Sequence, residues 1–312
     1  MMGRQAARRA LLAVLVIALA LFPLVGAKFY LTYATKIMIM AIFAMSLDLL
    51  VGVTGLVSLG HALYFGAAGY ALAMMDGPSL WWSLPAAMAV AALAALAIGA
   101  LVLRASGIYF IMATLAFAQM AYFFVRDSSY FGGSDGKYLN ARPDASLFGW
   151  RALDLDSHLH RYYLALALAL AVYVLLRRVL GSAFGRVLVG IRDNEARMRS
   201  LGFATFRYKL AAFVLAGALA GLAGYLTALQ DGIMNPEQLG WNRSGEALVM
   251  VILGGMGTLA GPALGAGALM ALELVFSTWT KHWQLLLGVF VIGVVLFMPR
   301  GLLARRKESG HG

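Results

Sequence analysis

Long apolar runs alternate with short polar segments along nearly the whole chain. About 20 apolar residues cross a bilayer as one helix, and a soluble protein could not bury so many such runs. The pattern predicts an all-α polytopic membrane protein, one transmembrane domain over residues 1–312, with about ten spans and a range of eight to eleven. The runs fall near residues 11–25, 31–51, 56–75, 81–103, 107–125, 161–176, 210–229, 246–260, 263–278 and 283–298.

Charged residues between the runs predict which segments face the cytoplasm. Segment 126–161 holds five basic and five acidic residues, whereas segment 177–209 holds eight basic and two acidic residues. Cytoplasmic loops carry an excess of Lys and Arg, so 177–209 is predicted to be a cytoplasmic loop and 126–161 an extracytoplasmic one. Basic residues also precede the first run and follow the last, which predicts both termini in the cytoplasm.

The first run is open to two interpretations. Arg4, Arg8 and Arg9 precede it, a pattern that suits either a cleaved signal peptide or a first membrane helix. Gly26 and Ala27 would serve as a cleavage site. An uncleaved helix is favoured because more apolar runs follow immediately.

Composition argues against an enzyme. The chain is 62% hydrophobic with a net charge of +11, which the basic loops explain without nucleic acid. It has no cysteine, which excludes disulfides and thiolate zinc sites. No catalytic or metal-binding motif is present. The stretch "GGSDGKY" is no Walker motif, because Phe131 and Tyr138 stand where glycine and Ser or Thr are needed. Energy for transport would come from a partner or an ion gradient.

Glycine gathers in one stretch of each half, "GVTGLVSLGHALYFGAAG" and "LGGMGTLAGPALGAG". Paired glycine-broken segments in the two halves indicate a transport pathway, and tight helix packing is the alternative. Gly257, Gly261 and Gly265 have the four-residue spacing of a packing face. Five spans in each half are compatible with an inverted repeat. The pathway or hinge candidates here are Gly55, Ser58, Gly60, Gly255, Gly257, Gly261 and Pro262.

Few ionisable residues fall within the apolar runs. Asp48 and His61 flank the first glycine-rich stretch, Glu273 lies deeper, and Glu246 lies near an outer boundary. Such residues are costly in a bilayer and are functional candidates by default. Structural hydrogen bonds are the alternative for Asp48 and His61, and a bond to a neighbouring helix is the alternative for Glu273.

The polar stretch "GIRDNEARMRSLG" at 190–202 predicts a short helix over 194–201. Asp193 is expected to cap it, Glu195 to pair with Arg199 four residues on, and Gly202 to end it. A helix this short is marginal alone, so it either lies on lipid headgroups or docks on a cytoplasmic partner.

Three long stretches resemble one family. They are "MSLDLLVGVTGLVSLGHALYFGAAGYALA", which contains a "SLGH" signature, "GRVLVGIRDNEARMRSLGFATFRYKLAAFVLAGALAGLAGYL", and "SGEALVMVILGGMGTLAGPALGA" followed by "LGVFVIGVVLFMPRGL". In this order they resemble the permease subunits of ATP-driven branched-chain amino acid importers, of the M-type (LivM-like), over residues 33–302.

The resemblance implies a multi-pass protein of the bacterial inner membrane. A second, LivH-like permease subunit, two cytoplasmic ATPases and an extracytoplasmic binding protein would complete the importer. This chain would bind no cofactor, since ATP and magnesium would sit on the ATPases. Residues 192–202 would form the helix that couples to an ATPase, although Arg197 follows Glu195 and Ala196 where the general importer pattern has a second alanine. The coupling candidates are Arg192, Asp193, Asn194, Glu195, Arg199 and Gly202.

Other functions remain open. Similar permeases carry urea, short amides or other amino acids. An ion-coupled secondary transporter would work without ATP. A membrane-embedded enzyme would need a catalytic cluster that the sequence lacks.

Overall fold

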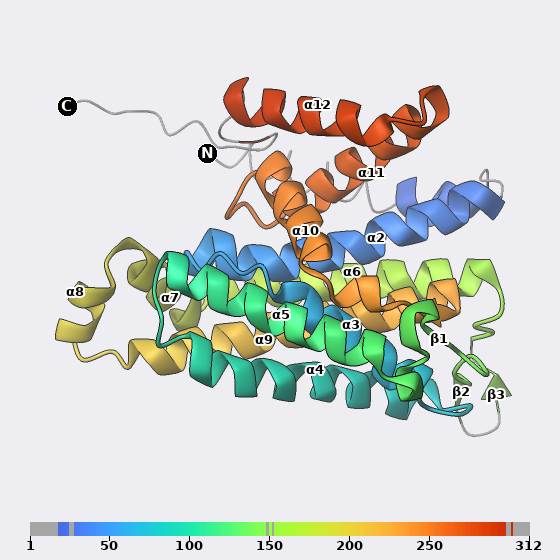
Figure 1. Ribbon diagram of the computed structural model, residues 1–312, viewed down its shortest axis with the longest axis horizontal. Coiled ribbons are helices and arrows are strands. Elements are labelled where there is room, and N and C mark those ends of the chain that lie inside the picture. Colours follow the sequence, from blue (N-terminus) through green and yellow to red (C-terminus); the bar gives the residue numbers. More distant parts are fainter. Residues whose placement is uncertain (1–17, 25–27, 148–149, 152, 298–300, 302–312) are drawn as a thin grey trace.

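The computed structural model describes residues 18–24, 28–147, 150–151, 153–297 and 301. Most of them lie in helices that run lengthwise through the molecule (Figure 1). The helices are α2 (Lys28–Asp48), α3 (His61–Ala73), α4 (Leu80–Val102), α5 (Ile108–Asp127), α6 (His158–Gly181), α7 (Ala183–Asp193), α8 (Glu195–Ser200), α9 (Thr205–Asp231), α10 (Trp241–Gly254), α11 (Gly261–Trp279) and α12 (Trp283–Phe297).

The two ends of the helix bundle differ. α7, α8 and the turn between α4 and α5 lie at one end, which we name the α8 end (Figure 1). Short strands lie at the other, the strand end. There β1 (Lys137–Tyr138) pairs with β4 (Ile233–Met234), and β2 (Ser146–Leu147) pairs with β3 (Trp150–Arg151), both antiparallel.

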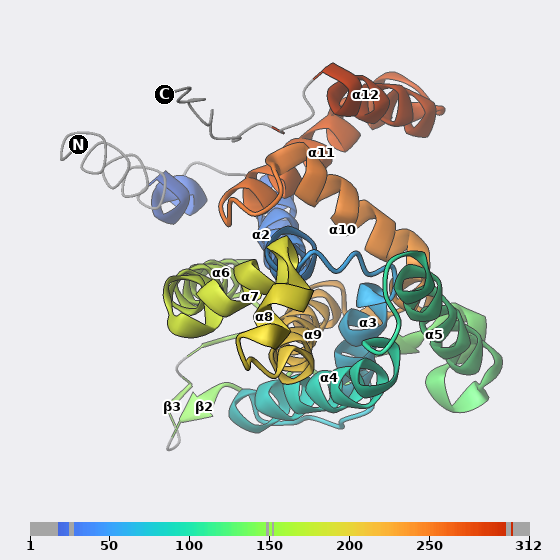
Figure 2. The same cartoon turned by 90° about the vertical axis from the view of Figure 1, so that its left-hand side faces the viewer.

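Helix α9 is the centre of the bundle. It packs against α2, α3, α4 and α6, which surround it when the molecule is viewed from the α8 end (Figure 2). Close packing comes from small residues: a Cβ on Gly217 would lie 2.5 Å from the Ala95 Cβ, and one on Gly221 2.4 Å from the Ala91 Cβ. Gly217 and Gly221 are four residues apart on α9, as are Ala91 and Ala95 on α4. The two helices therefore meet along faces of small residues, as is common in membranes.

Six described helices are long and apolar enough to cross a membrane. They match the predicted runs at 31–51, 81–103, 107–125, 161–176, 210–229 and 263–278. They are Lys28–Thr54, Leu80–Val102, Ile108–Asp127, His158–Gly181, Thr205–Asp231 and Gly261–Trp279. The first predicted run lies mostly outside the described residues, as do the arginines before it, the candidate cleavage site and most of the basic tail.

Three predicted runs do not form helices of spanning length among the described residues. The run at 283–298 forms the 15-residue α12. The run at 56–75 forms only the 13-residue α3, and the run at 246–260 ends its helix, the 14-residue α10, at Gly254. α2 is prolonged by a π-helical turn, Leu49–Thr54, and the chain then runs without helix to His61. We call residues 49–60 the first break and residues 255–260 the second break. Both breaks contain glycine, which permits the backbone conformations that interrupt a helix. Such irregular backbone is tolerated at membrane depth where it is buried in the protein.

Candidate functional site

Helices α7 and α8 form a hairpin at the α8 end. The Ser182 hydroxyl accepts the first cap bond of α7, from the Gly185 N–H. The α8 cap is Asn194, whose Oδ1 accepts from the Arg197 N–H at 2.9 Å. The prediction that Asp193 caps α8 was therefore wrong: Asp193 is the last residue of α7, and the extended backbone of Asn194 separates the two helices.

The predicted helix, its ion pair and its end are confirmed. Glu195 Oε1 lies 2.7 Å from Arg199 Nη2, and Gly202 follows the helix with a φ of +86°. That backbone conformation favours glycine and ends the helix. Met198 covers Gly190 of α7, where a Cβ would lie 2.8 Å from the Met198 sulfur. The two short helices therefore support each other.

Glu195 anchors α8 to α9. Its Oε1 lies 2.9 Å from the Lys209 Nζ and accepts from the Thr205 hydroxyl at 3.0 Å. Partial burial raises the Glu195 pKa, but hydrogen bonds from Lys209 and Arg199, the charge of Lys209 and the Thr205 hydroxyl outweigh it and lower the pKa to about 2. Lys209 was not among the sequence candidates. It directly precedes the apolar run at 210–229 and lies one turn inside α9.

Arg192 ties the hairpin to the first break. Its Nη1 donates to the Gly52 carbonyl oxygen, across 140 positions of sequence. Gly55, with a φ of +74°, faces the stem of the same side chain: a Cβ there would lie 2.9 Å from the Arg192 Cγ. The last turn of α7 thus lies against the π-helical turn that ends α2.

The two breaks meet at this point. Asp48 is 1% exposed, and its Oδ1 accepts from the Gly257 N–H at 2.7 Å. A Cβ on Gly52 would lie 2.3 Å from the Gly257 nitrogen and 2.2 Å from the Asp48 Oδ1. Only glycine therefore allows this approach at position 52. We name Asp48, Gly52, Arg192 and Gly257 the break junction.

The second break has a tightly turned backbone. Gly255 and Gly257 have positive φ angles, and Leu259 has a φ of +58°, a conformation that costs a non-glycine residue on the order of 1–3 kcal/mol. The Thr258 hydroxyl donates to the Gly255 carbonyl at 2.7 Å and accepts from the Gly261 N–H at 3.1 Å. These bonds hold the turn closed.

Only part of the predicted glycine face is a helix face. Gly257 lies in the turn, whereas Gly261 and Gly265 pack against α10, where a Cβ on Gly265 would lie 1.9 Å from the Met250 carbonyl oxygen. Pro262 occupies the first turn of α11, a position that tolerates proline because its missing N–H has no partner there.

His61 begins α3 on the far side of the first break. Its Nε2 is 2.8 Å from the Ser46 hydroxyl, and its ring stacks on Phe43. Among the described residues its Nδ1 has no hydrogen-bond partner. The Ser58 hydroxyl accepts from the Gly60 N–H at 3.3 Å, and a Cβ on Gly60 would meet the Thr114 carbonyl oxygen at 2.4 Å. These contacts hold α3 against α2 and α5.

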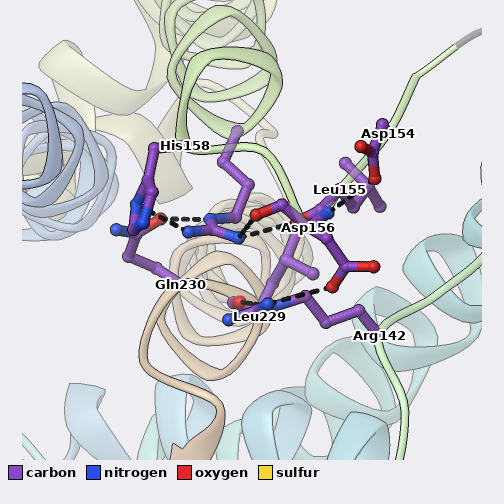
Figure 3. A network of polar contacts seen from close by, with 8 residues as sticks. Arg142, Asp154, Leu155, Asp156, His158, Leu229 and Gln230 are labelled. Carbon is purple, nitrogen blue, oxygen red and sulfur yellow. Dashed lines mark hydrogen bonds and ion pairs between the residues drawn. The ribbon is translucent and has the colours of Figure 1, made fainter. Parts of the chain in front are cut away.

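A polar network at the strand end holds the segment that leads into α6 against the end of α9 (Figure 3). The buried Arg161 donates to the carbonyl oxygens of Leu155 at 2.7 Å and Asp156 at 3.0 Å, and to the Gln230 Oε1 at 2.9 Å. Arg142 adds an ion pair with Asp156 at 3.0 Å. Segment 126–161 is therefore bonded to the end of α9.

Glu273, the remaining candidate, lies apart from the break junction and lines a cavity of 260 Å³.

Comparisons with known proteins point to one family. A family model described as "Branched-chain amino acid transport system / permease component" matches residues 29–298. The "High-affinity branched-chain amino acid transport system permease protein LivM" of Salmonella typhimurium is 30% identical over 316 residues, 94% of this chain and 74% of the relative. The protein of the same name from Escherichia coli gives the same values. The "Autoinducer 2 import system permease protein LsrC" of Klebsiella pneumoniae is 34% identical over 41% of this chain and 40% of its own length. No solved structure gives a significant match.

Proposed function

The chain belongs to the family of permease components of branched-chain amino acid transport systems, and from this premise we propose how it works in an ATP-driven importer. It is a multi-pass membrane permease subunit, not an enzyme, as the three sequence stretches predicted. In our proposal it lines the translocation pathway together with a second, LivH-like permease subunit. Two ATPase subunits bind ATP and magnesium, and a binding protein delivers the substrate.

We infer that the α8 end faces the cytoplasm of the bacterial inner membrane. The excess of eight basic over two acidic residues in segment 177–209 supports this orientation. The strand end, with segment 126–161, then faces outward and receives the binding protein. Ten spans with both termini inside, arranged as an inverted repeat of five and five, fit the same orientation.

The contact between Arg192 and the first break carries the proposed coupling mechanism. α8 docks on an ATPase, and the Glu195 anchor makes α8 and the start of α9 move together. α7 follows, and its Arg192 pulls on the Gly52 carbonyl. Because Gly52 touches Gly257, that pull changes the contact between the two breaks. ATP binding and hydrolysis would thereby open the pathway alternately to the two sides of the membrane.

Docking and coupling can be separated by two variants. Arg197 is exposed on α8, and its side chain makes no hydrogen bond or ion pair among the described residues, although its backbone groups do. Arg197→Glu should therefore reduce co-purification of the ATPases by about tenfold or more without disturbing the hairpin. Arg104→Glu, in the α4–α5 turn at the same end, is the matched control. Retention of the ATPases by Arg197→Glu at the control level would contradict docking through α8.

Arg192→Met should behave differently. The ATPases should still co-purify and hydrolyse ATP, whereas uptake into proteoliposomes with the binding protein should fall about tenfold or more, since a charge-assisted hydrogen bond contributes about 1.5–3 kcal/mol. Arg178→Met, an exposed arginine of α6, is the control. Normal uptake by Arg192→Met would exclude Arg192 as the link.

Uptake by the chain alone without ATP would overturn the importer proposal and favour an ion-coupled carrier.

The cargo is proposed from the family. The two LivM relatives are named for branched-chain amino acids and the partial relative for autoinducer 2. Identification of the ligand held by the partner binding protein tests this directly, with urea, short amides and other amino acids as the alternative outcomes.

A further inference from the structure

A cavity of 260 Å³ lies between α2, α9, α10, α11 and α12. Water takes about 30 Å³ per molecule, so the cavity is large enough for a small amino acid. One part of its wall is apolar, with Ile39, Met40, Met250, Leu269 and Met270. The other part is charged and holds Lys36, Asp231, Arg243, Glu246 and Glu273. Concave sites that join an apolar wall to a few polar groups are typical of small-molecule binding.

The charged residues are only partly paired with each other. Lys36 Nζ lies 2.9 Å from Asp231 Oδ1, and Arg243 Nη1 lies 2.6 Å from Glu246 Oε2. Among the described residues Glu273 makes no ion pair or hydrogen bond. The Nε of Arg243 is buried and the guanidinium lies over the Phe65 ring, so a ligand does not reach that nitrogen. The Nη2 of Arg243 makes no hydrogen bond or ion pair among the described residues, on a side chain that is 26% exposed. The cavity therefore offers a ligand the Glu273 carboxylate and the Nη2 group of Arg243.

We propose that this cavity binds the zwitterion of an aliphatic amino acid during its passage. The ammonium group binds Glu273, the carboxylate binds the Arg243 guanidinium, and the aliphatic side chain lies on the methionine-rich wall. Both charges of the ligand are then neutralised, as a membrane-embedded site requires. The assignment rests on the proposed function, since it takes the chain to be an amino acid permease.

The position of the cavity supports entry from the strand end. Gln230 lines the cavity and accepts a hydrogen bond from Arg161, whose other bonds hold the carbonyl oxygens of Leu155 and Asp156 (Figure 3). A partner that shifts segment 126–161 would thus move a group in the cavity wall. The break junction is formed by other residues, so the cavity and the junction are separate sites.

Ligand analogues test the site on the wild-type chain, independently of any variant. Binding of radiolabelled leucine to the full-length chain in lipid nanodiscs is measured in competition with leucine, leucinamide and 4-methylpentanoate. Leucinamide lacks the carboxylate and 4-methylpentanoate lacks the ammonium group. Each should compete about tenfold or more weakly than leucine, because each loses one charge-assisted bond. Equal competition by all three, or no leucine binding, would overturn the proposal.

Matched variants then assign the charges. Glu273→Gln should weaken leucine binding about tenfold or more, whereas Glu237→Gln, an exposed glutamate outside the cavity, should not. Arg243→Lys should weaken leucine binding, and Arg104→Lys should not. Binding of 4-methylpentanoate should be insensitive to Glu273→Gln, because that ligand has no ammonium group. Equal weakening of both ligands would contradict the assigned contact.

The two proposals fail in distinguishable ways. If the complete importer takes up leucine with ATP while Glu273→Gln binds and transports it like Glu237→Gln, the cavity proposal is wrong and the proposed function stands. If the wild-type importer shows no ATP-dependent uptake of any amino acid, the proposed function itself is wrong.

Discussion

The α8 end and the strand end of this permease are built from different interactions. At the α8 end, the break junction depends on backbone groups in close approach, with Gly52 touching Gly257 and Arg192 bonded to a carbonyl oxygen. At the strand end, long side chains such as Arg161 and Arg142 bridge segments through several bonds each. Small residues let backbones approach closely, whereas the side-chain network fixes a loop. The difference agrees with the roles proposed for the two ends, coupling to the ATPases at the α8 end and contact with the binding protein at the strand end.

The largest effect is expected from Gly52→Ala. A Cβ there would lie 2.2 Å from the Asp48 Oδ1 and 2.3 Å from the Gly257 nitrogen, so the two breaks must separate. Overpacking of this kind costs about 1–3 kcal/mol, and we expect uptake to be lost. Gly267→Ala is the control, because its Cβ would meet only the Ile37 Cγ2 at 3.7 Å. Equal uptake by the two variants would mean that transport does not need the close contact.

A smaller effect, on stability rather than movement, is expected from Arg161→Met at the strand end. The change leaves Gln230 and the carbonyl oxygens of Leu155 and Asp156 without their donor. Loss of such bonds should destabilise the folded chain by about 2 kcal/mol, measured as a lower midpoint of thermal unfolding in detergent. Arg126→Met, an exposed arginine of α5, should leave the midpoint unchanged. If both variants melt alike, the network does not stabilise this end.

Sequence patterns predicted the local elements better than the contacts between them. The pair of Glu195 with Arg199 follows from helical spacing, and six apolar runs follow from hydropathy. The choice between Asp193 and Asn194 as the cap depended on where α7 ends, and both residue types are good caps. The contact of Asp48 with Gly257 joins residues 209 positions apart, and no local pattern contains that pairing. The cavity requires five helices at once, so only Glu273 and Glu246 could be suspected as isolated charges.

The smallest expected effect concerns Glu195 and separates anchoring from docking. Its pKa is lowered from the ordinary 4.5 to about 2, so its contribution to stability is present above about pH 4.5 and is lost as the pH falls toward 2. Because Glu195 is partly exposed, screening reduces that contribution to about 1 kcal/mol. The chain has no cysteine, so a fluorophore on Ser200→Cys can report release of α8 from α9 as acid is added. Glu195→Gln should release α8 at neutral pH and abolish the transition, whereas Asp193→Asn should keep it. A transition that persists in Glu195→Gln would show that another acid anchors α8, and the joint movement of α8 with α9 would then need a different contact.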